Sequence, residues 1–455
     1  MRRAAALCAC LALAACGAPV TEMPARLPPS PASLPPMKTF PAPPPDRPTR
    51  SNVEIAQDFL DLSFQMESGR PLPYMTRFEE PVSLRVTGPV PPSLNPDLAT
   101  LLTRLRREAG IDIARVPADR AANVTIEMVP HDQIRRLVPQ AACFVAPRVS
   151  SWEEYRGSRR SGRVDWRTLA TREQVAIFIP LDVSPQEIRD CLNEELAQAL
   201  GPLNDLYRLP DSVFNDDNFH TVLTGFDMLV LRLYYAPELR SGMTRAQVAA
   251  LLPGLLARMN PRGQRVAGGP VEPSSRDWID AIETALGPDT RTERRLAAAE
   301  RAVRIARAHD WNDSRLAFSY FALGRLSLGS NGDAALRAFL QAGQIYASRP
   351  ETQLQAAHVA MHLAAFALAS GPEGAETARK LVDRHLGEAM RSQNAALLAT
   401  MLLIKAEALD LEGRAAEART IRSEALGWAR YGFGSDSEVR ARMAEIASLP
   451  PHFTM

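Results

Sequence analysis

The sequence predicts an α+β domain followed by an all-α domain of repeated helices, and three observations indicate this division. Short strand-like apolar segments alternate with helical patterns through the first part of the chain. Residues 261–275 are rich in Gly, Pro and Ser, which is typical of a linker. After Trp278 the composition is dominated by Ala, Leu, Arg and Glu, which favours helices. We expect the α+β domain over residues 51–262, a linker over 263–285 and the helical domain over 286–455.

Length and charge limit the class of protein. The chain has 455 residues, more than one hydrophobic core normally organises, so two domains are expected. Its 53 Lys and Arg nearly balance its 52 Asp and Glu, which argues against nucleic-acid binding. After the N-terminal segment, no apolar run reaches the ~20 residues that a membrane-spanning helix needs.

The N-terminal segment has the three parts of a bacterial export signal. Arg2 and Arg3 precede an apolar stretch over residues 4–12, and the tetrapeptide Leu-Ala-Ala-Cys ends at Cys16. This tetrapeptide is typical of a lipobox, at which the leader is cut and the cysteine receives acyl chains such as palmitate. We expect residues 1–15 to be the signal peptide and Cys16 to be the lipidated membrane anchor. The alternative is a buried N-terminal helix.

The residues after Cys16 indicate which membrane holds the protein and how it is attached. Gly17 stands where an aspartate would retain a lipoprotein in the inner membrane, so the periplasmic side of the outer membrane is expected. Residues 16–50 are about one third proline, a composition that favours extended chain and builds no core. We expect a disordered tether here, with a ligand for proline-recognition modules as the alternative.

The elements of the α+β domain can be placed from local patterns. Ser51 is expected to cap a first helix, and a second amphipathic helix is expected over residues 98–109. Strands are expected over residues 82–86, 111–116, 124–129 and 175–181. The pairs Ser184-Pro185 and Gly201-Pro202 are typical of the start and the end of a helix, which is expected over residues 186–200.

Two cysteines remain in the exported chain once Cys8, Cys10 and Cys16 are set aside. They are Cys143 and Cys191. Because an oxidising compartment favours pairing, we expect a disulfide between them. Closing a loop of that length stabilises a fold by ~4 kcal/mol. The alternative is two separate buried thiols.

The helix over residues 186–200 carries a spacing that resembles the metzincin-type zinc proteases. Their frame H-E-x-x-H-x-x-G-x-x-H supplies three imidazole ligands, a general-base glutamate and a glycine at the turn. Here the corresponding residues are, in order, Glu194, Glu195, Gln198, Gly201 and Asn204. The general base and the turn glycine are kept, whereas all three ligands are replaced.

The replaced ligands argue against a zinc cofactor. Zinc prefers nitrogen and thiolate donors, and this frame offers one carboxylate and two neutral amides. His131 and His220 are the imidazoles between residues 51 and 261, too few to rebuild the site. We therefore expect no cofactor. Glu194 and Glu195 are adjacent on a helix and point in different directions, so they are not a glycosidase pair.

An oxygen-rich loop follows the frame. Residues 215–218 read Asn-Asp-Asp-Asn, and together with Asp205 and Asp211 they could hold a calcium ion. The alternative is a solvated, turn-forming loop, since the regular loop pattern of a calcium hand is missing.

Taken together, these residues resemble a family of unknown function (DUF2927) of Gram-negative secreted and lipid-anchored proteins, itself similar to zincin-like peptidases. The resemblance implies a zincin-like α+β domain, in which Met228 or Met243 corresponds to the methionine turn. Core packing of these methionines is the alternative. The resemblance rests on Cys143-Phe144, residues 191–205, residues 212–216, Phe226-Asp227-Met228-Leu229, Leu233-Tyr234-Tyr235 and Gly242-Met243.

Two stretches of the helical domain resemble degenerate tetratricopeptide repeats. Glycines at 332, 374 and 413 punctuate the helices at a period near forty, longer than the ~34 residues of the regular repeat. A generic helical bundle is the alternative. A stacked array would give a concave surface suited to protein contacts. The two stretches contain Tyr320, Leu323, Gly324, Ala335, Phe339 and Ala342, and then Ala406, Leu409, Gly413, Ala418 and Ala425.

His358 and His362 lie one helical turn apart in this domain. Such a pair could chelate a metal, but no third ligand is near in the sequence. A packed or surface pair is the expected reading.

These observations predict a lipid-anchored scaffold with a metal-less zincin-like domain and a helical domain that binds a periplasmic protein or peptide. The alternative is an atypical peptidase or cell-wall hydrolase that uses Glu195 as general base. A transcriptional regulator is disfavoured by the export signal and by the lack of a basic recognition helix.

Overall fold

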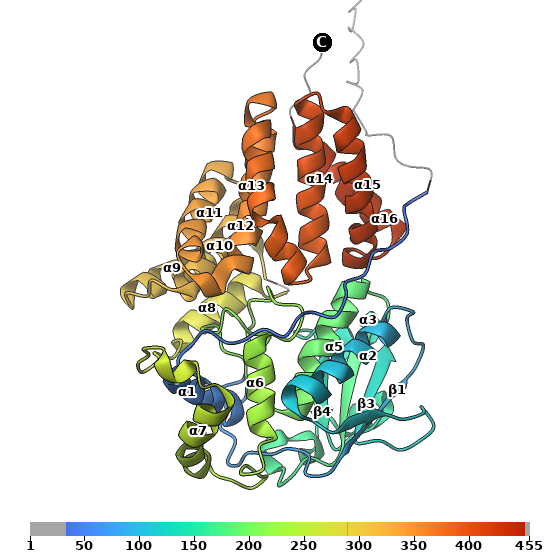
Figure 1. Ribbon diagram of the computed structural model, residues 1–455, viewed down its shortest axis with the longest axis vertical. Helices are drawn as coiled ribbons and strands as arrows, with labels where there is room; N and C mark the ends of the chain where they lie inside the picture. The colour runs from blue at the N-terminus through green and yellow to red at the C-terminus, as the bar shows by residue number, and fades with distance from the viewer. Residues whose placement is uncertain (1–32, 289, 451–455) are drawn as a thin grey trace, which may run out of the picture.

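The computed structural model describes residues 33–288 and 290–450, which form two packed domains (Figure 1). The expected signal peptide and the lipidated Cys16 lie outside the described residues. Within the described ranges, no helix combines the length and the apolar composition that crossing a bilayer requires.

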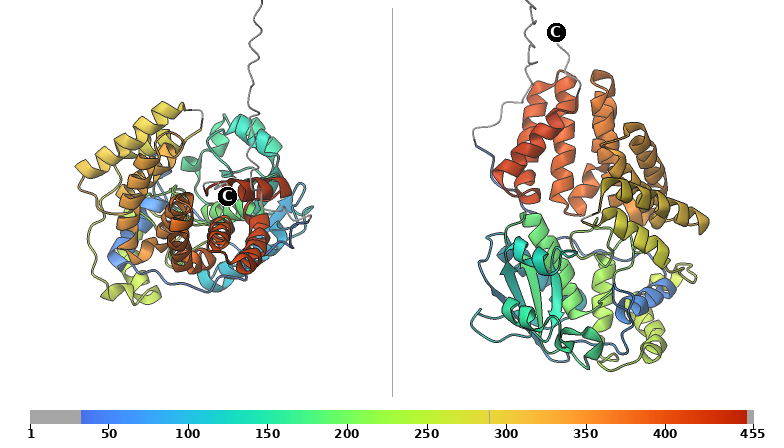
Figure 2. Two further views of the ribbon diagram at one scale, coloured as in Figure 1. Left: turned by 90° about the horizontal axis from the view of Figure 1, so that it is seen from above. Right: turned by 180° about the vertical axis from the view of Figure 1, so that it is seen from behind.

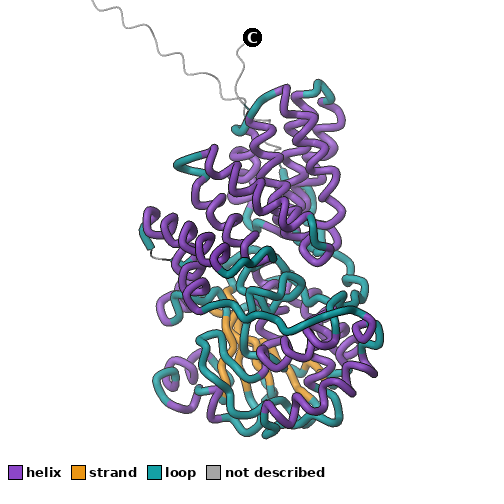
Figure 3. Tube along the Cα trace, turned by 90° about the vertical axis from the view of Figure 1, so that its left-hand side faces the viewer, coloured by secondary structure: helices purple, strands orange, loops and turns teal. Residues whose placement is uncertain are grey.

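A five-stranded sheet forms the centre of the first domain (Figure 3). Its order is β2-β1-β3-β5-β4, and all neighbours are parallel except the edge strand β4, which runs antiparallel to β5. Every residue of β5 is buried, as its unbroken apolar sequence leads one to expect for an inner parallel strand. The strands are β1 (Val82–Thr87), β2 (Ile113–Arg115), β3 (Val124–Val129), β4 (Phe144–Pro147) and β5 (Val175–Pro180).

The sheet confirms the four predicted strands to within a few residues and adds β4. Its four residues pair in register with β5, Phe144 opposite Phe178. Behind this edge, the rings of Phe144, Trp152, Tyr155 and Phe178 pack together, with Phe144 and Phe178 centred 5.1 Å apart. These rings cover one face of the sheet and hold the short edge strand in place.

Helix α5 packs against the other face of the sheet, and, within the described residues, six further helices complete the first domain. The capping boxes Ser51 with Glu54 and Ser184 with Glu187 start α1 and α5 where the sequence predicts. The second predicted helix begins earlier, at Leu94, and its last turn over residues 105–109 is π-helical before Gly110 at φ 72°. The helices are α1 (Asn52–Ser63), α2 (Leu94–Arg104), α3 (His131–Leu137), α4 (Trp152–Ser158), α5 (Pro185–Leu200), α6 (Gly225–Tyr234) and α7 (Arg245–Met259).

The second domain is entirely helical within its described residues. Consecutive helices pack against each other, and α12 also contacts α14, which contacts α16 (Figures 1 and 2). The helices are α8 (Arg276–Leu286), α9 (Thr292–Ala308), α10 (Ser314–Ser327), α11 (Gly332–Ala347), α12 (Gln353–Ala369), α13 (Pro372–Arg391), α14 (Ala395–Leu411), α15 (Ala415–Gly432) and α16 (Asp436–Ala447).

Helix α8 lies in the stretch that the sequence analysis assigns to a linker, and this differs from the expectation. Trp278 is fully buried in the core of the helical domain, and its indole N–H donates to Ser319 Oγ over 2.9 Å. The clustered Gly, Pro and Ser end just before α8, so the connecting segment is shorter than predicted.

Small residues let the paired helices approach closely. At Gly324, an added Cβ would lie 2.9 Å from the Phe339 ring of the next helix. Gly413, at φ 77°, reverses the chain between α14 and α15. Helices α8, α10, α12, α14 and α16 begin about forty residues apart, which matches the period in the sequence.

Residues 33–50 differ from the predicted free tether. They run extended along both domains, where Phe40 stacks on Trp428 at 4.4 Å and Lys38 N–H donates to the Gly427 carbonyl over 2.9 Å (Figure 1). At the other end, Arg50 is paired with Asp58 and with Asp211. A proline-rich segment builds no hydrophobic core of its own. Its few apolar and basic side chains instead pack against the two folded domains. We call residues 33–50 the strap.

Candidate functional site

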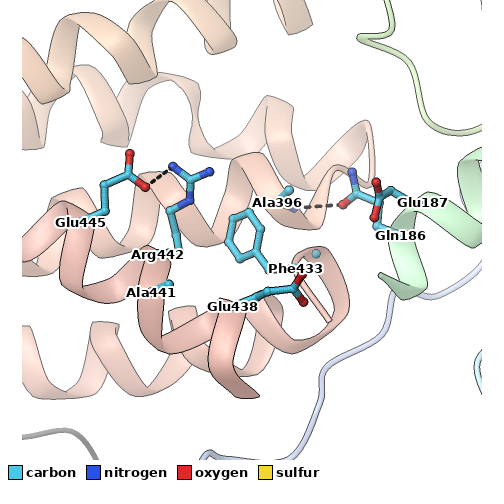
Figure 4. Close-up of a pocket in the computed structure, with 9 residues that line it drawn as sticks. Gln186, Glu187, Ala396, Phe433, Glu438, Ala441, Arg442 and Glu445 are labelled. Atoms are coloured by element: carbon cyan, nitrogen blue, oxygen red, sulfur yellow. Dashed lines mark hydrogen bonds and ion pairs between the residues drawn. The ribbon is translucent and has the colours of Figure 1, made fainter. Parts of the chain in front are cut away.

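Helix α5 joins the two domains, and its N-terminal half is fixed at their interface. The guanidinium of Arg189 donates to the Gln393 carbonyl over 2.6 Å and lies over the Tyr431 ring. Gln186 donates to Asn394 Oδ1 over 3.2 Å and accepts from the Ala396 N–H over 2.9 Å (Figure 4). Buried polar contacts of this kind fix orientation, because each group would be left unsatisfied if the domains moved apart.

A buried arginine fixes the other end of α5. Arg172 donates to the carbonyls of Gln198 over 2.6 Å and Ala199 over 2.8 Å, and also to that of Gly201. These carbonyls have no partner within the helix, because the last turn of a helix leaves its acceptors free. Burial lowers the pKa of Arg172 from its ordinary value. Arg172 was not identified from the sequence, since no local pattern distinguishes it from other arginines.

Gly201 ends α5 because of close packing. A Cβ at this position would lie 3.0 Å from Leu231 and 3.4 Å from Tyr234 on α6. The backbone of Gly201 is not left-handed, at φ −147°, and the packing on α6 leaves little room for a Cβ.

The C-terminal half of α5 lines a pocket of about 440 Å³, which we call the acidic pocket. Glu195 and Gln198 are buried, whereas Glu67 and Arg70 are exposed. The pocket therefore has a carboxyl and an amide at its inner end and charged groups at its mouth. Its lining residues include Met66, Glu67, Arg70, Phe144, Val145, Trp166, Glu194, Glu195, Gln198, Leu203 and Asp216.

The predicted frame residues divide into two groups. Glu194, Glu195 and Gln198 line the acidic pocket, and Gln198 also donates to Asp205 Oδ2 over 3.3 Å. Asn204 points elsewhere, because its amide donates to the Asp61 carbonyl at the end of α1 over 2.9 Å. Asn204, which stands in the place of the third zinc ligand, therefore holds the end of α1.

The predicted disulfide is present. Cys143 and Cys191 are joined with an S–S length of 2.03 Å. The bond ties α5 to the segment before β4, and residues 140–145 form one wall of the acidic pocket. The disulfide thus links two sides of the site.

Three carboxyl groups of the pocket have raised pKa values. Burial and then the charges of Asp216 and Glu67 raise the pKa of Glu194 to about 8. Burial, Glu194 and Glu67 raise the pKa of Glu195 well above its ordinary value. Burial and then Glu67 raise the pKa of Asp216 to about 7. Crowded carboxylates in a poorly solvated site behave in this way.

The loop over residues 215–218 forms hydrogen bonds mainly with itself and with its neighbours. Asn215 donates to the Leu209 carbonyl over 2.8 Å, and Asp217 accepts the Phe219 N–H over 3.2 Å. Asp211, the expected companion ligand, is paired with Arg50. These contacts are those of a turn-forming loop. Among the described residues, no three His, Cys, Asp or Glu side chains are placed to hold one metal ion.

The two methionines suggested for a methionine turn belong to the core. Met228 is buried in the core cluster of the first domain and Met243 packs against that cluster. Neither is among the lining residues of the acidic pocket. This agrees with the core-packing alternative.

Comparison with known families covers the first domain. Residues 52–254 match the family described as Protein of unknown function (DUF2927). This segment runs from α1 into α7, so the DUF2927 segment contains the whole acidic pocket. No curated protein and no solved structure matches the chain.

A long loop of the DUF2927 segment, between α5 and α6, packs into the helical domain. The rings of Tyr207 and Trp278 meet edge to face at 5.2 Å, and those of Phe219 and Phe321 are centred 5.1 Å apart. Gln355 donates to the Pro210 carbonyl over 2.6 Å. The core of the helical domain therefore includes side chains of the DUF2927 segment.

Beside this loop lies a larger cavity of about 1010 Å³, which we call the inner groove. Helices α10, α12, α14 and α16 line it, together with residues 217–219. A smaller pocket of about 520 Å³, lined by Gln186, Glu187, Phe433 and Arg442, adjoins it (Figure 4). Apolar side chains cover much of the groove, and its charged lining residues are Glu187, Asp217, Arg325, Arg442 and Glu445.

His358 and His362 are a packed pair in the wall of the groove. His362 stacks on Phe339 at 4.4 Å, and His358 meets Phe219 at 4.8 Å. Burial lowers the pKa of His358 to about 3 and that of His362 to about 4. Both rings are neutral near pH 7, and they contribute to packing.

Proposed function

We propose that this chain is a non-catalytic binding scaffold, held at the periplasmic side of the outer membrane by lipidated Cys16. One observation carries the non-catalytic part. Where the resembled proteases hold three imidazole ligands, this chain has Glu194, Gln198 and Asn204, and the Asn204 amide donates to the Asp61 carbonyl instead. Zinc prefers nitrogen and thiolate donors, so these three side chains are unsuited to holding the metal that would activate water.

We further propose that the first domain is zincin-like and the second tetratricopeptide-like. Support for the first is that Glu194, Glu195 and Gln198 share one pocket and Gly201 ends their helix. Support for the second is the forty-residue spacing and the close packing of Gly324 on Phe339. Alternate helices of such an array form a continuous inner surface, which suits a polypeptide partner.

The partner site in this proposal is the inner groove, and a crosslinking experiment tests it. Leu328 lines the groove and is 44% exposed, whereas Leu340 on α11 is 51% exposed and lies outside it. A photoreactive residue at 328 should form a discrete adduct with another polypeptide in intact cells. The same residue at 340 is the matched control. Equal labelling from both positions, or none from either, would contradict the groove as the partner site.

The second candidate function is a hydrolase, favoured by the position of Glu195. Its Oε2 is buried in the pocket wall and has no hydrogen-bond partner among the described residues. Metal analysis of the purified chain separates the two functions, and we expect no stoichiometric zinc. One zinc per chain, with a peptidase activity that Glu195→Gln abolishes, would overturn the scaffold.

A further inference from the structure

The acidic pocket has more carboxyl groups than basic groups among its described lining residues. Glu67, Glu194, Glu195 and Asp216 line it, and Arg70 is the one basic residue among its described lining residues. Arg70 is exposed at the mouth, where its Nε donates to Ser68 Oγ over 3.2 Å. No described cation is among the groups that shift the pKa of Glu194 or of Glu195.

The inner end contains a polar atom without a partner. Glu195 is 4% exposed, and its Oε2 accepts no hydrogen bond from the described residues. A buried carboxyl oxygen in this state is costly, and native structures seldom tolerate it without a compensating ligand. Asp205 Oδ1, next to the pocket through the contact of Asp205 with Gln198, is unpartnered as well.

We propose that the acidic pocket binds an organic cation, an ammonium or guanidinium group that enters past Glu67 and Asp216 and donates to Glu194 and Glu195. A metal ion would need its ligand oxygens to converge within ~2.6 Å of one point, and the described carboxylates do not converge in that way. An ammonium offers three N–H donors and a guanidinium five, so each can reach carboxylates that stand apart.

The pocket also has a place for the stem of such a cation. Phe144, Trp166 and Leu203 line it beside the carboxylates. Aliphatic stems of basic groups pack on apolar surfaces of this kind while the charge is paired. The cation could be a Lys or Arg side chain of a partner polypeptide or a free diamine, and both carry the same chemistry.

This inference rests on the proposed role of the first domain as a binding module and is independent of the inner groove. Titration calorimetry of the purified full chain tests it with three probes. These are 1,4-diaminobutane, a short blocked peptide rich in arginine, and a blocked peptide of the same length in which alanine replaces arginine. We expect the diamine or the arginine peptide to bind and the alanine peptide not to bind.

Matched variants place the binding in the pocket. Glu195→Gln should weaken cation binding by about tenfold or more. Glu153→Gln is the control, because Glu153 is exposed on α4 and does not line the pocket. If Glu195→Gln is poorly folded, Glu194→Gln serves in its place, with a circular dichroism spectrum as the check on folding.

The pH dependence of the affinity gives a second readout. Since pKa values near 7 and 8 leave Asp216 and Glu194 partly protonated, a cation must displace protons, and affinity should rise from about pH 6 to about pH 8. Nonspecific attraction of the cation to exposed carboxylates elsewhere would release no protons, and its affinity would not rise in this pH range. The titratable and charged groups around the site are Glu67, Arg70, Asp190, Glu194, Glu195, Asp205, Tyr207, Asp216 and Glu283.

The outcomes separate the possibilities. Binding of the diamine alone identifies a small-molecule site, and binding of the arginine peptide alone identifies a polypeptide site. Absence of both, equal loss in the Glu153 and Glu195 variants, or preferential binding of calcium or zinc tested alone would each overturn the proposal. Because the crosslinking at residue 328 probes a different surface, its failure would leave the cation result interpretable.

Discussion

Replacement of Arg172 by methionine should lower the free energy of unfolding of the first domain by about 3–5 kcal/mol. The guanidinium is buried and donates to three carbonyls at the end of α5, and to Thr76 Oγ1 over 3.2 Å. Methionine fills similar space but donates nothing, so those carbonyls would be buried without partners. Urea unfolding followed by circular dichroism measures the change.

Two further variants test the cause of that loss. Arg172→Lys should recover part of the stability, because an ammonium keeps the charge but cannot reach the carbonyls with a planar fork. Arg167→Met is the surface control, since Arg167 pairs with Asp165 in an exposed ion pair, and its unfolding midpoint should not change measurably. A similarly small change in Arg172→Met would show that water replaces the guanidinium at these carbonyls.

Local signals explain why much of the fold could be predicted. The caps at Ser51 and Ser184 act through hydrogen bonds within three residues, so the sequence alone displays them. Strand β5 is an unbroken apolar segment and is recognisable for the same reason. The pairing of Cys143 with Cys191 followed from the number of cysteines left once the expected signal peptide and Cys16 are set aside, without knowledge of the fold.

The features that were not predicted depend on contacts distant in sequence. Strand β4 has four residues, too few for a periodic pattern, and its pairing with β5 defines it. The strap is held by Trp428 on α15, nearly four hundred residues from Phe40. Helix α8 follows directly on a run of Gly, Pro and Ser, and this composition obscured the burial of Trp278.

The candidate site shows the same limit. The spacing on α5 brings Glu194 and Glu195 each close to Gln198, because residues three and four apart share a helix face, and all three line the acidic pocket. It could not place Asn204, which lies after the helix and whose direction is set by the Asp61 carbonyl. Glu67 comes from a different part of the chain, and its approach to α5 is visible only in the fold.

Removal of the disulfide should also destabilise the first domain strongly. In the double variant Cys143→Ala, Cys191→Ala the free energy of unfolding should fall by ~4 kcal/mol, because the two cysteines are separated by 48 residues and the unfolded chain regains that loop. Denaturant unfolding of both proteins, without reductant, measures the difference. With reductant added, the natural chain should lose the same stability and the variant should be unaffected.

The position of the bond predicts a native-state effect as well. Residues 140–142 form a pocket wall between α3 and β4, and the disulfide is their covalent tie to α5. In the double variant, amide hydrogen exchange should accelerate there, while β4 stays protected by its pairing with β5. Unchanged exchange together with the full loss of stability would assign the effect to the unfolded chain alone. Accelerated exchange through β4 would instead mean that the bond, and not the strand pairing, holds this edge of the sheet in place.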